Sequence, residues 1–303
     1  MKNTFSIQDD FVNSRLDRWF RRQVSDVPQS LIEKNLRKGN IKVNNKKEKS
    51  SYKLRLNDLV IIKNINFTKN NIKVIKRNYI PTKKDLSLSS DLFIENNENF
   101  VVINKPSGIS VQSGTKSKQN ILDILKKTRE FADSQPYTVH RIDKETTGLL
   151  IVAKNRKFAQ LFTSLFRIRK IHKTYLGIVI GEIPKKIGTL KDELFTYEGN
   201  KKIKTIAITN YTVLDSNNKY SLLELSPVTG RKHQLRKQLL IYGNPILGDS
   251  KYRISTKYTI KKNTLMLHAY RINFSIGVKK YNYYADPPEA FNKILKEKYL
   301  KIS

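Results

Sequence analysis

The sequence predicts an α+β protein in which a large domain, built on a mixed or antiparallel sheet, follows a small αα-β module. Many short strand-like segments occur with few, separated helical patterns, which argues against a doubly wound fold. The 303 residues suffice for one large and one small domain. We expect these domains at residues 1–80 and 91–303. Residues 81–90 contain Pro and Ser without a firm period and are expected to form a linker.

The small module is expected to begin with two helices. Ser14 can cap the first helix, with Asp17 three residues later as its capping-box partner. Pro28 and Ser30 open the second helix, and Gly39 ends it. Two short apolar segments follow and are expected to form strands; they are residues 41–43 and 59–62.

Cations are denser in this module than elsewhere, at positions expected to be helix ends and hairpins. They are Arg15, Arg18, Arg21, Arg22, Arg37, Lys38, Lys42, Lys46 and Lys47. Such positions suit contact with phosphates. The competing interpretation is a solvated basic face, and the clustering of the cations favours phosphate contact.

The large domain is expected to contain several strands and two clear helices. Its strand-like segments are residues 92–94, 100–103, 149–153, 174–180, 206–214 and 221–225. Asn155 can cap a helix that ends near Arg167 and carries an aromatic stripe at helical spacing, which we interpret as core. Pro287 and Pro288 introduce a last helix that ends near Leu300.

The composition indicates a polyanionic partner. Lys and Arg number 59 against 26 Asp and Glu, a net charge of +33, and nucleic acid is the default polyanion. Compositional drift in a chain rich in Lys, Asn and Ile is the alternative, and +33 exceeds what solubility asks of a chain this size. The absence of cysteine excludes disulfides, thiolate nucleophiles and Cys-based metal sites.

The sequence gives no sign of a membrane or a secretory route. No uncharged apolar run reaches the length of a membrane span, and the N-terminal segment carries Asp9 and Asp10 without an apolar core. We therefore expect a cytoplasmic protein that contacts no membrane.

The most informative segment is the loop H-R-I-D-K-E-T-T-G, which directly precedes the apolar run 149–153. A loop at the mouth of a buried strand is held rigidly enough to aim side chains at a ligand. Asp143 lies in this loop between Arg141 and Lys144. Cations on both sides keep a carboxylate ionised, so that it can act as a nucleophile, a base or an electrostatic element.

Two further segments carry candidate functional side chains. Tyr175 begins an apolar strand, where its ring can stack on a base and its hydroxyl can relay a proton; simple packing is an equally good interpretation. In S-P-V-T-G-R-K-H-Q-L-R, Arg236 can pair with a buried carboxylate while Arg231 meets a phosphate. From the residues alone, two surface arginines are the simpler interpretation.

Common catalytic and metal-binding motifs are absent. The sequence contains no phosphate loop, no nucleophile elbow and no H-E-x-x-H pair. Its histidines, His140, His172, His233 and His268, lack the spacing of metal ligands. We expect chemistry without a cofactor or a metal.

Several ordered motifs together carry a resemblance to a known family. The segments H-R-I-D-K-E-T-T-G, K-T-Y-L-G and G-R-K-H-Q-L-R resemble the three signature regions of the RluA/RluC/RluD family of RNA pseudouridine synthases. The segment N-K-P-S-G is similar to the leading motif of that family, and residues 14–63 resemble the S4 RNA-binding module. The resemblance covers about residues 14–285 and is greatest to the RluC branch, which modifies large-subunit ribosomal RNA.

The resemblance implies a role for each matching residue. Asp143 is the catalytic aspartate, Tyr175 stacks on the uracil and assists proton removal, and Arg236 holds Asp143 charged and oriented. Arg141 fills the gap left by the extruded uridine. The resemblance, with the basic module, further implies a set of substrate or RNA contacts: His140, Thr147, Leu235, Arg231, Lys105, Arg15, Arg37 and Lys38. The chain departs from the family pattern at Ile142, Thr147, Lys232 and Gln238, where Leu, Ser, Thr and His are more usual.

The implied function is the isomerisation of uridine to pseudouridine in large-subunit ribosomal RNA by a monomeric enzyme. The carboxylate can attack C1′ of the ribose or C6 of the base, or remove the C2′ proton, and the sequence leaves all three open. Two alternatives remain: a transfer-RNA synthase of the same family, and a non-catalytic S4-type RNA-binding protein of ribosome assembly. The presence of Asp143, Tyr175 and Arg236 together favours the enzyme.

Overall fold

The computed structural model describes residues 2–63, 92–112, 120–198, 201–254 and 264–302. The chain divides into two compact units, residues 1–76 and 77–303. The linker expected at 81–90 lies outside the described residues. Within the described residues, none of the helices combines the length and apolar character needed to cross a membrane.

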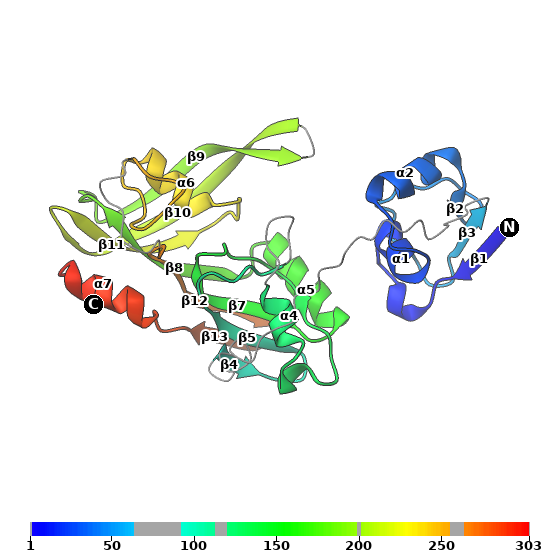
Figure 1. The fold of residues 1–303 in the computed structure, drawn as a ribbon, viewed down its shortest axis with the longest axis horizontal. Helices are drawn as coiled ribbons and strands as arrows, with labels where there is room; N and C mark the ends of the chain where they lie inside the picture. The colour runs from blue at the N-terminus through cyan, green and yellow to red at the C-terminus, as the bar shows by residue number, and fades with distance from the viewer. Residues whose placement is uncertain (1, 64–91, 113–119, 199–200, 255–263, 303) are drawn as a thin grey trace. The chain divides into compact units, whose positions relative to one another are not determined.

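The first unit packs two helices against a three-stranded antiparallel sheet (Figure 1). Its elements are β1 (Lys2–Ser6), the 3-10 turn η1 (Asp9–Phe11), α1 (Leu16–Gln23), α2 (Gln29–Lys38), β2 (Ile41–Val43) and β3 (Leu59–Lys63), with strand order β1-β3-β2. Its core includes Leu16, Trp19 and Phe20 from the apolar face of α1 and Ile32 and Leu36 from α2. The expected αα-β module is present, with β1 added at the sheet edge.

The end of α2 agrees with the prediction, whereas the start of α1 does not. Gly39 ends α2 in the left-handed conformation, with φ 77°, as expected for a residue without a Cβ. The expected cap at Ser14 is wrong, because Arg15 is the N-cap residue of α1 and its side chain makes no capping bond. The carboxylate of Asp17 accepts hydrogen bonds from Arg15 and Gln29 instead.

The second unit is built on one ten-stranded mixed sheet (Figure 1). Its strands are β4 (Phe93–Asn96), β5 (Phe100–Lys105), β6 (Tyr137–Thr138), β7 (Thr147–Ala153), β8 (His172–Ile180), β9 (Ile187–Glu198), β10 (Lys201–Asn217), β11 (Tyr220–Pro227), β12 (Leu267–Ile276) and β13 (Lys279–Tyr284). The main path runs β4-β5-β7-β12-β8-β11-β10-β9. All its pairs are antiparallel except β12 with β7.

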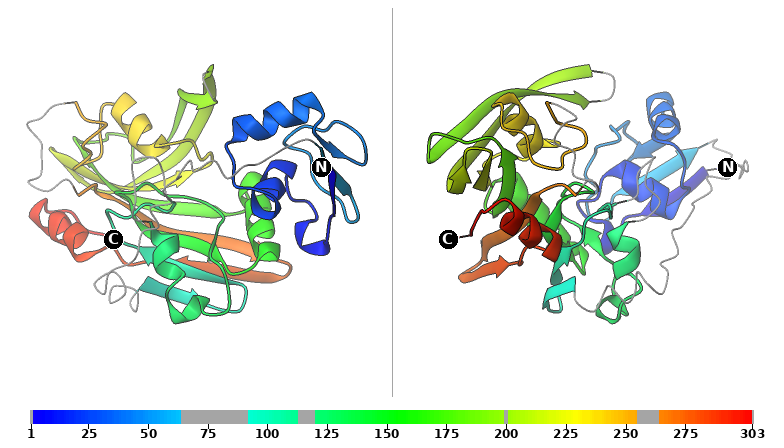
Figure 2. Two further views of the ribbon diagram at one scale, coloured as in Figure 1. Left: turned by 45° about the vertical axis from the view of Figure 1, so that its right-hand side comes forward. Right: turned by 60° about the vertical axis from the view of Figure 1, so that its left-hand side comes forward.

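Four α-helices and one 3-10 turn accompany this sheet in the described part of the second unit; they are α4 (Ile121–Leu125), η3 (Arg129–Phe131), α5 (Arg156–Arg167), α6 (Gln234–Ile241) and α7 (Glu289–Glu297). Asn155 caps α5 by accepting a hydrogen bond from the backbone N–H of Phe158, as expected. The aromatic stripe of α5 packs on the core, with Phe162 fully buried against Phe100. The views of Figure 2 show α6 beside the β9–β10 hairpin.

One close backbone approach fixes the parallel pair at the centre of the sheet. Gly148 has φ 104°, and a Cβ there would lie 2.3 Å from the carbonyl oxygen of Ala269. Only glycine allows β7 and β12 to come this close. The mixed α+β architecture that the sequence predicts is confirmed.

Candidate active site

The turn that follows β5 holds the loop before β7 in place. The ammonium of Lys105 donates to the carbonyls of Pro106 (2.7 Å), Ile109 (3.0 Å) and Lys144 (3.2 Å). The N–H of Gly108 donates to the same Lys144 carbonyl at 2.9 Å. All residues of β7 are buried, which anchors the other end of the loop. The N-K-P-S-G turn therefore positions the backbone that directly follows Asp143.

Lys105 is fully buried, so its ammonium contacts backbone carbonyls and does not reach the surface. This placement differs from the expected contact with RNA. Burial lowers the pKa of Lys105 to about 7, and the negative charges of Glu145 and Asp143 oppose that shift. The sequence identified the residue but gave no sign of the direction of its side chain.

Asp143 is brought to Arg236, as the sequence analysis expected. The Nη1 atom of Arg236 donates to Oδ2 of Asp143 at 3.3 Å. The Asp143 side chain keeps 21% of its surface exposed, whereas that of Arg236 keeps 3%. Glu145 also approaches Nη1, at 3.5 Å. The guanidinium is therefore a buried fixture, and the Asp143 carboxylate faces an opening.

Asp249, which no sequence motif marks, is a second carboxylate partner of Arg236. Its fully buried carboxylate accepts from Nε and Nη2 of Arg236 at 2.7 and 2.8 Å, a bidentate pair. It also accepts from the backbone N–H groups of Lys251 and Tyr252. Burial alone would raise the pKa of Asp249, but the bonds from Arg236 and the two N–H groups lower it. Asp249 is the tighter partner of Arg236.

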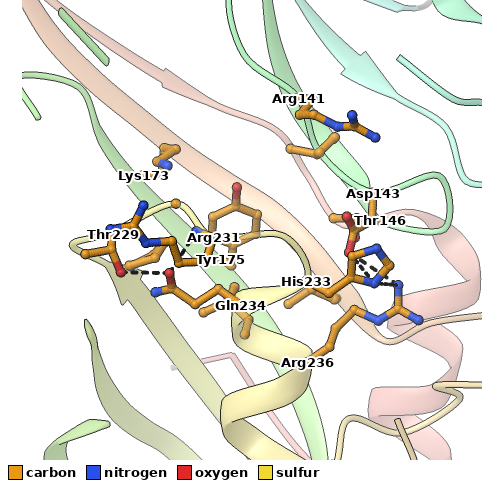
Figure 3. A pocket seen from close by; sticks show the side chains of 15 residues that line it. Arg141, Asp143, Thr146, Lys173, Tyr175, Thr229, Arg231, His233, Gln234 and Arg236 are labelled. Carbon is orange, nitrogen blue, oxygen red and sulfur yellow. Dashed lines mark hydrogen bonds and ion pairs between the residues drawn. The ribbon is translucent and has the colours of Figure 1, made fainter. Parts of the chain in front are cut away.

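His233 lies beside the Arg236–Asp143 ion pair and carries backbone strain. It is the N-cap residue of α6 with φ 54°, a left-handed conformation that is uncommon for a residue with a Cβ. Its Nδ1 lies 3.3 Å from Nη1 of Arg236 and 3.8 Å from Oδ2 of Asp143 (Figure 3). Burial lowers the pKa of His233, and the charge of Arg236 adds to that effect while Asp143 opposes it.

Tyr175 stands on β8 with only 9% of its surface exposed, and its ring faces the same pocket (Figure 3). Burial raises the pKa of the Tyr175 hydroxyl above its ordinary value, and the charge of Asp143 raises it further. The phenol is therefore neutral at physiological pH.

These side chains line one pocket that encloses about 520 Å³ of empty space, including open solvent. Its lining comprises Arg141, Ile142, Asp143, Thr146, Lys173, Tyr175, Pro227, Thr229, Gly230, Arg231, His233, Gln234, Leu235, Arg236 and Leu267. Among these lining residues of the described chain, Asp143 is the one carboxylate, and four are Lys or Arg. Of the expected contacts, Arg141, Arg231 and Leu235 belong to this lining.

Two other expected contacts turn inward. His140 accepts a hydrogen bond at Nε2 from the backbone N–H of Ile151 (2.9 Å), and its ring packs on Phe166. Thr147 is buried and shares a 2.8 Å hydrogen bond with Nδ1 of His268. Neither residue lines the pocket. His140 supports the interior of β7, and Thr147 is the first residue of that strand.

The expected RNA contacts of the first unit lie on its surface. Arg37 and Lys38 are exposed at the end of α2. Arg15 is partly exposed and is paired with Asp17 at 2.6 Å. In the part of the chain that the structure describes, no group of three His, Asp or Glu side chains is arranged to hold a metal ion.

Comparison with known proteins gives the family to which this fold and pocket belong. Residues 99–240 match the family described as RNA pseudouridylate synthase. A ribosomal large subunit pseudouridine synthase C from Vibrio vulnificus is 32% identical over 278 residues, covering 89% of this chain and 87% of that protein. A protein of the same name from Buchnera aphidicola subsp. Baizongia pistaciae is 33% identical over 301 residues, covering 93% and 94%. The chain belongs to the RNA pseudouridine synthase family.

Solved structures agree with this family. Human RNA pseudouridylate synthase domain containing 4 is 27% identical, has a TM-score of 0.61, and is matched over 98% of its chain and 72% of this one. Human RNA pseudouridylate synthase domain containing 1, at 22% identity and a TM-score of 0.55, shares the fold; the match covers 65% of this chain and 83% of that one. The fold class and the enzyme class expected from the sequence are confirmed.

Proposed function

We propose that this enzyme isomerises uridine in large-subunit ribosomal RNA, with Asp143 as the catalytic carboxylate. One observation carries the assignment of Asp143: it is the one carboxylate in the lining of a cationic pocket, and a buried guanidinium orients it. The names of the similar Vibrio and Buchnera proteins support the substrate. A monomer in the cytoplasm remains part of this proposal.

The reaction breaks the bond between N1 of uracil and C1′ of ribose, rotates the base and rejoins it through C5. The C5 proton leaves to solvent, and N1 takes up a proton. The target base must first leave the RNA stack, which costs a few kcal/mol. Arg141 is exposed at the edge of the pocket and can occupy the space that the base leaves. Arg231 is also exposed, and its position suits contact with a neighbouring phosphate.

Tyr175 and Leu235 supply the surfaces that receive the base. The Tyr175 ring forms one wall and can stack on uracil, while Leu235 forms part of another. Because the pKa of Tyr175 is raised, its hydroxyl acts as a neutral donor or relay and not as a phenolate base.

Arg236 keeps Asp143 ionised and aimed at the ligand. Its guanidinium is fixed by Asp249, so it does not need to move when the charge on Asp143 changes. Electrostatic groups held in place before the reaction stabilise developing charge most effectively. The exposed cations of the first unit, among them Arg37 and Lys38, would add affinity for RNA by tethering it near the pocket.

Asp143→Asn tests the catalytic assignment. Tritium release from RNA that carries 5-tritiated uridine is expected to fall to background, because an amide can act neither as the nucleophile nor as the base. Binding of the same RNA is expected to remain, since most of the affinity comes from phosphate contacts. Glu145→Gln is the matched control, because Glu145 also approaches Arg236 but lies outside the pocket lining. Tritium release by the Glu145→Gln variant should persist. Release by Asp143→Asn at the wild-type rate would refute the assignment.

The substrate is tested separately by mapping pseudouridines in total RNA from cells with and without the gene. Loss of specific modifications in large-subunit ribosomal RNA is the expected result. Losses confined to transfer RNA would replace the proposed substrate with the alternative one and leave the enzyme assignment intact.

A further inference from the structure

A buried chain of polar side chains connects one wall of the pocket to the β9–β10 hairpin. It runs through Thr229, Gln234, Thr209, Gln238 and Asp192, and each neighbouring pair is hydrogen bonded. Thr209 and Gln238 are fully buried. Buried amides and hydroxyls are retained only where their hydrogen bonds are satisfied.

The pocket end of the chain fixes the turn between β11 and α6. Oε1 of Gln234 accepts from the hydroxyl of Thr229 at 2.7 Å and from the backbone N–H of Arg231 at 3.0 Å. Nε2 of Gln234 donates to the carbonyl of Ile208 at 3.1 Å. Both Thr229 and Arg231 line the pocket, so Gln234 holds that wall against β10 (Figure 3).

The direction of the hydrogen bonds passes from one amide to the next. Because Nε2 of Gln234 donates to Thr209 Oγ1 at 2.9 Å, the Thr209 hydroxyl gives its one proton to Oε1 of Gln238 at 2.6 Å. Nε2 of Gln238 then faces only acceptors: the carbonyls of Leu190 and Ala207, both at 3.2 Å, and Oδ2 of Asp192 at 2.7 Å. The backbone groups at both ends leave one consistent orientation for the two amides.

The two glutamines also set the rotation of α6. Gln234 and Gln238 are four residues apart and therefore lie on one face of this helix. That face bonds to β9 and β10, while Arg236, on the same helix, bonds to Asp143. A small rotation of α6 would change the separation between Arg236 and Asp143 and would move the wall formed by Leu235.

We propose that Gln238 is a positioning residue for the reaction, and that Asp192 is its anchor on the hairpin. This proposal rests on the proposed function, because it concerns the geometry around Asp143. Gln238 contacts neither Asp143 nor the pocket, and it acts through Thr209, Gln234 and the setting of α6.

Gln238→Met and Thr209→Val each interrupt this chain of hydrogen bonds with little change in side-chain volume. Each is expected to lower the single-turnover rate of tritium release about 10- to 100-fold, as expected for a small misplacement of reacting groups. The affinity for RNA should not change, because neither side chain is exposed. If these linked hydrogen bonds act as a unit, the double variant should be no slower than the slower of the two single variants.

Ser221→Ala is the matched control. Ser221 is also fully buried, donates to the carbonyl of Gly181 at 2.9 Å and accepts from the N–H of Ile183, but it lies on β11 outside the chain. It should lose stability without losing rate. Wild-type single-turnover rates in the folded Gln238→Met and Thr209→Val proteins would overturn the proposal.

Asp192 provides a second test that does not depend on a core substitution, because its side chain is only partly buried. Asp192→Ala should slow the reaction, and Asp192→Asn, which keeps an acceptor oxygen for Gln238, should restore it. Equal rates in these two variants would also overturn the proposal. The proposed function fails by a different result, an active Asp143→Asn enzyme, so the two failures are distinguishable.

Discussion

Asp249→Asn is expected to destabilise the second unit far more than Asp143→Asn, although both carboxylates bind the same guanidinium. Asp249 makes two short bonds to Arg236 and is fully buried, whereas Asp143 makes one bond of 3.3 Å and remains partly exposed. Removing one partner of a buried ion pair costs about 3–5 kcal/mol, because the other charge stays buried without compensation. Arg236 keeps Asp143 in the Asp249→Asn variant, so we expect about 3 kcal/mol.

This loss is large enough to measure by calorimetry. In a domain of about 150–250 residues, a change of 1 kcal/mol shifts the melting temperature by about 2–4 °C, so Asp249→Asn should melt about 6–12 °C lower. Asp143→Asn should cost less than about 1 kcal/mol, as a partly exposed pair does. The chain has one tryptophan, Trp19, in the core of the first unit, and its fluorescence provides an internal control that should not change.

The stability contributed by Asp249 should depend on pH in a definite direction. The pKa of Asp249 is lowered in the folded protein. Its contribution to stability is therefore present above the ordinary pKa of an aspartate and is lost as the pH falls through the lowered value. The difference in melting temperature between wild type and Asp249→Asn should shrink in acid. The reasoning is refuted if Asp143→Asn is the less stable variant, or if the difference widens as the pH falls.

Three further outcomes are expected. Lys105→Met removes the amine that donates to the carbonyls of Pro106 and Ile109. Urea unfolding should therefore show a free energy of unfolding lower by about 2–4 kcal/mol, with unchanged RNA affinity. Weakened RNA binding would instead indicate direct contact. Tyr175→Phe removes the hydroxyl and keeps the stacking ring. Because the pKa of Tyr175 is raised, the alkaline limb of the pH–rate profile of this variant should match that of the wild type. Disappearance of that limb would show that the hydroxyl titrates during turnover. Gly148→Ala places a Cβ 2.3 Å from the Ala269 carbonyl oxygen and should yield little folded protein. Gly108 also has a positive φ, 84°, but nothing lies within 4 Å of a Cβ there, so Gly108→Ala should fold despite that backbone strain. Equal yields would contradict the close approach of β7 and β12.

The sequence predicted those features that depend on local pattern. The run 149–153 identified the buried strand β7, and the position of the loop before it placed Asp143 at an opening. Asn155 and Gly39 marked helix ends correctly because their chemistry acts within one turn of the chain. Tyr175 and Arg236 were identified through their motifs, and the structure brings both to the pocket of Asp143.

Features that depend on the direction of a side chain were not accessible from the sequence. Lys105, His140 and Thr147 were expected to face RNA, but each turns into the protein to bond with the backbone or with another buried side chain. Asp249 was missed because its pairing with Arg236 joins a turn to a helix through tertiary packing. A buried guanidinium requires a carboxylate, but the sequence does not say which one supplies it.

The arrangement around Arg236 separates two tasks that a single ion pair would combine. If Asp143 were the main partner, the guanidinium would lose its anchor whenever Asp143 became protonated or bonded to the substrate. Asp249 removes this dependence, because its bidentate contact holds Arg236 without any contribution from Asp143. The longer, single bond to Asp143 orients a carboxylate that stays partly exposed to the pocket. In the proposed reaction, Asp249 therefore fixes the guanidinium and Asp143 is left for the chemistry, although the two carboxylates share one arginine.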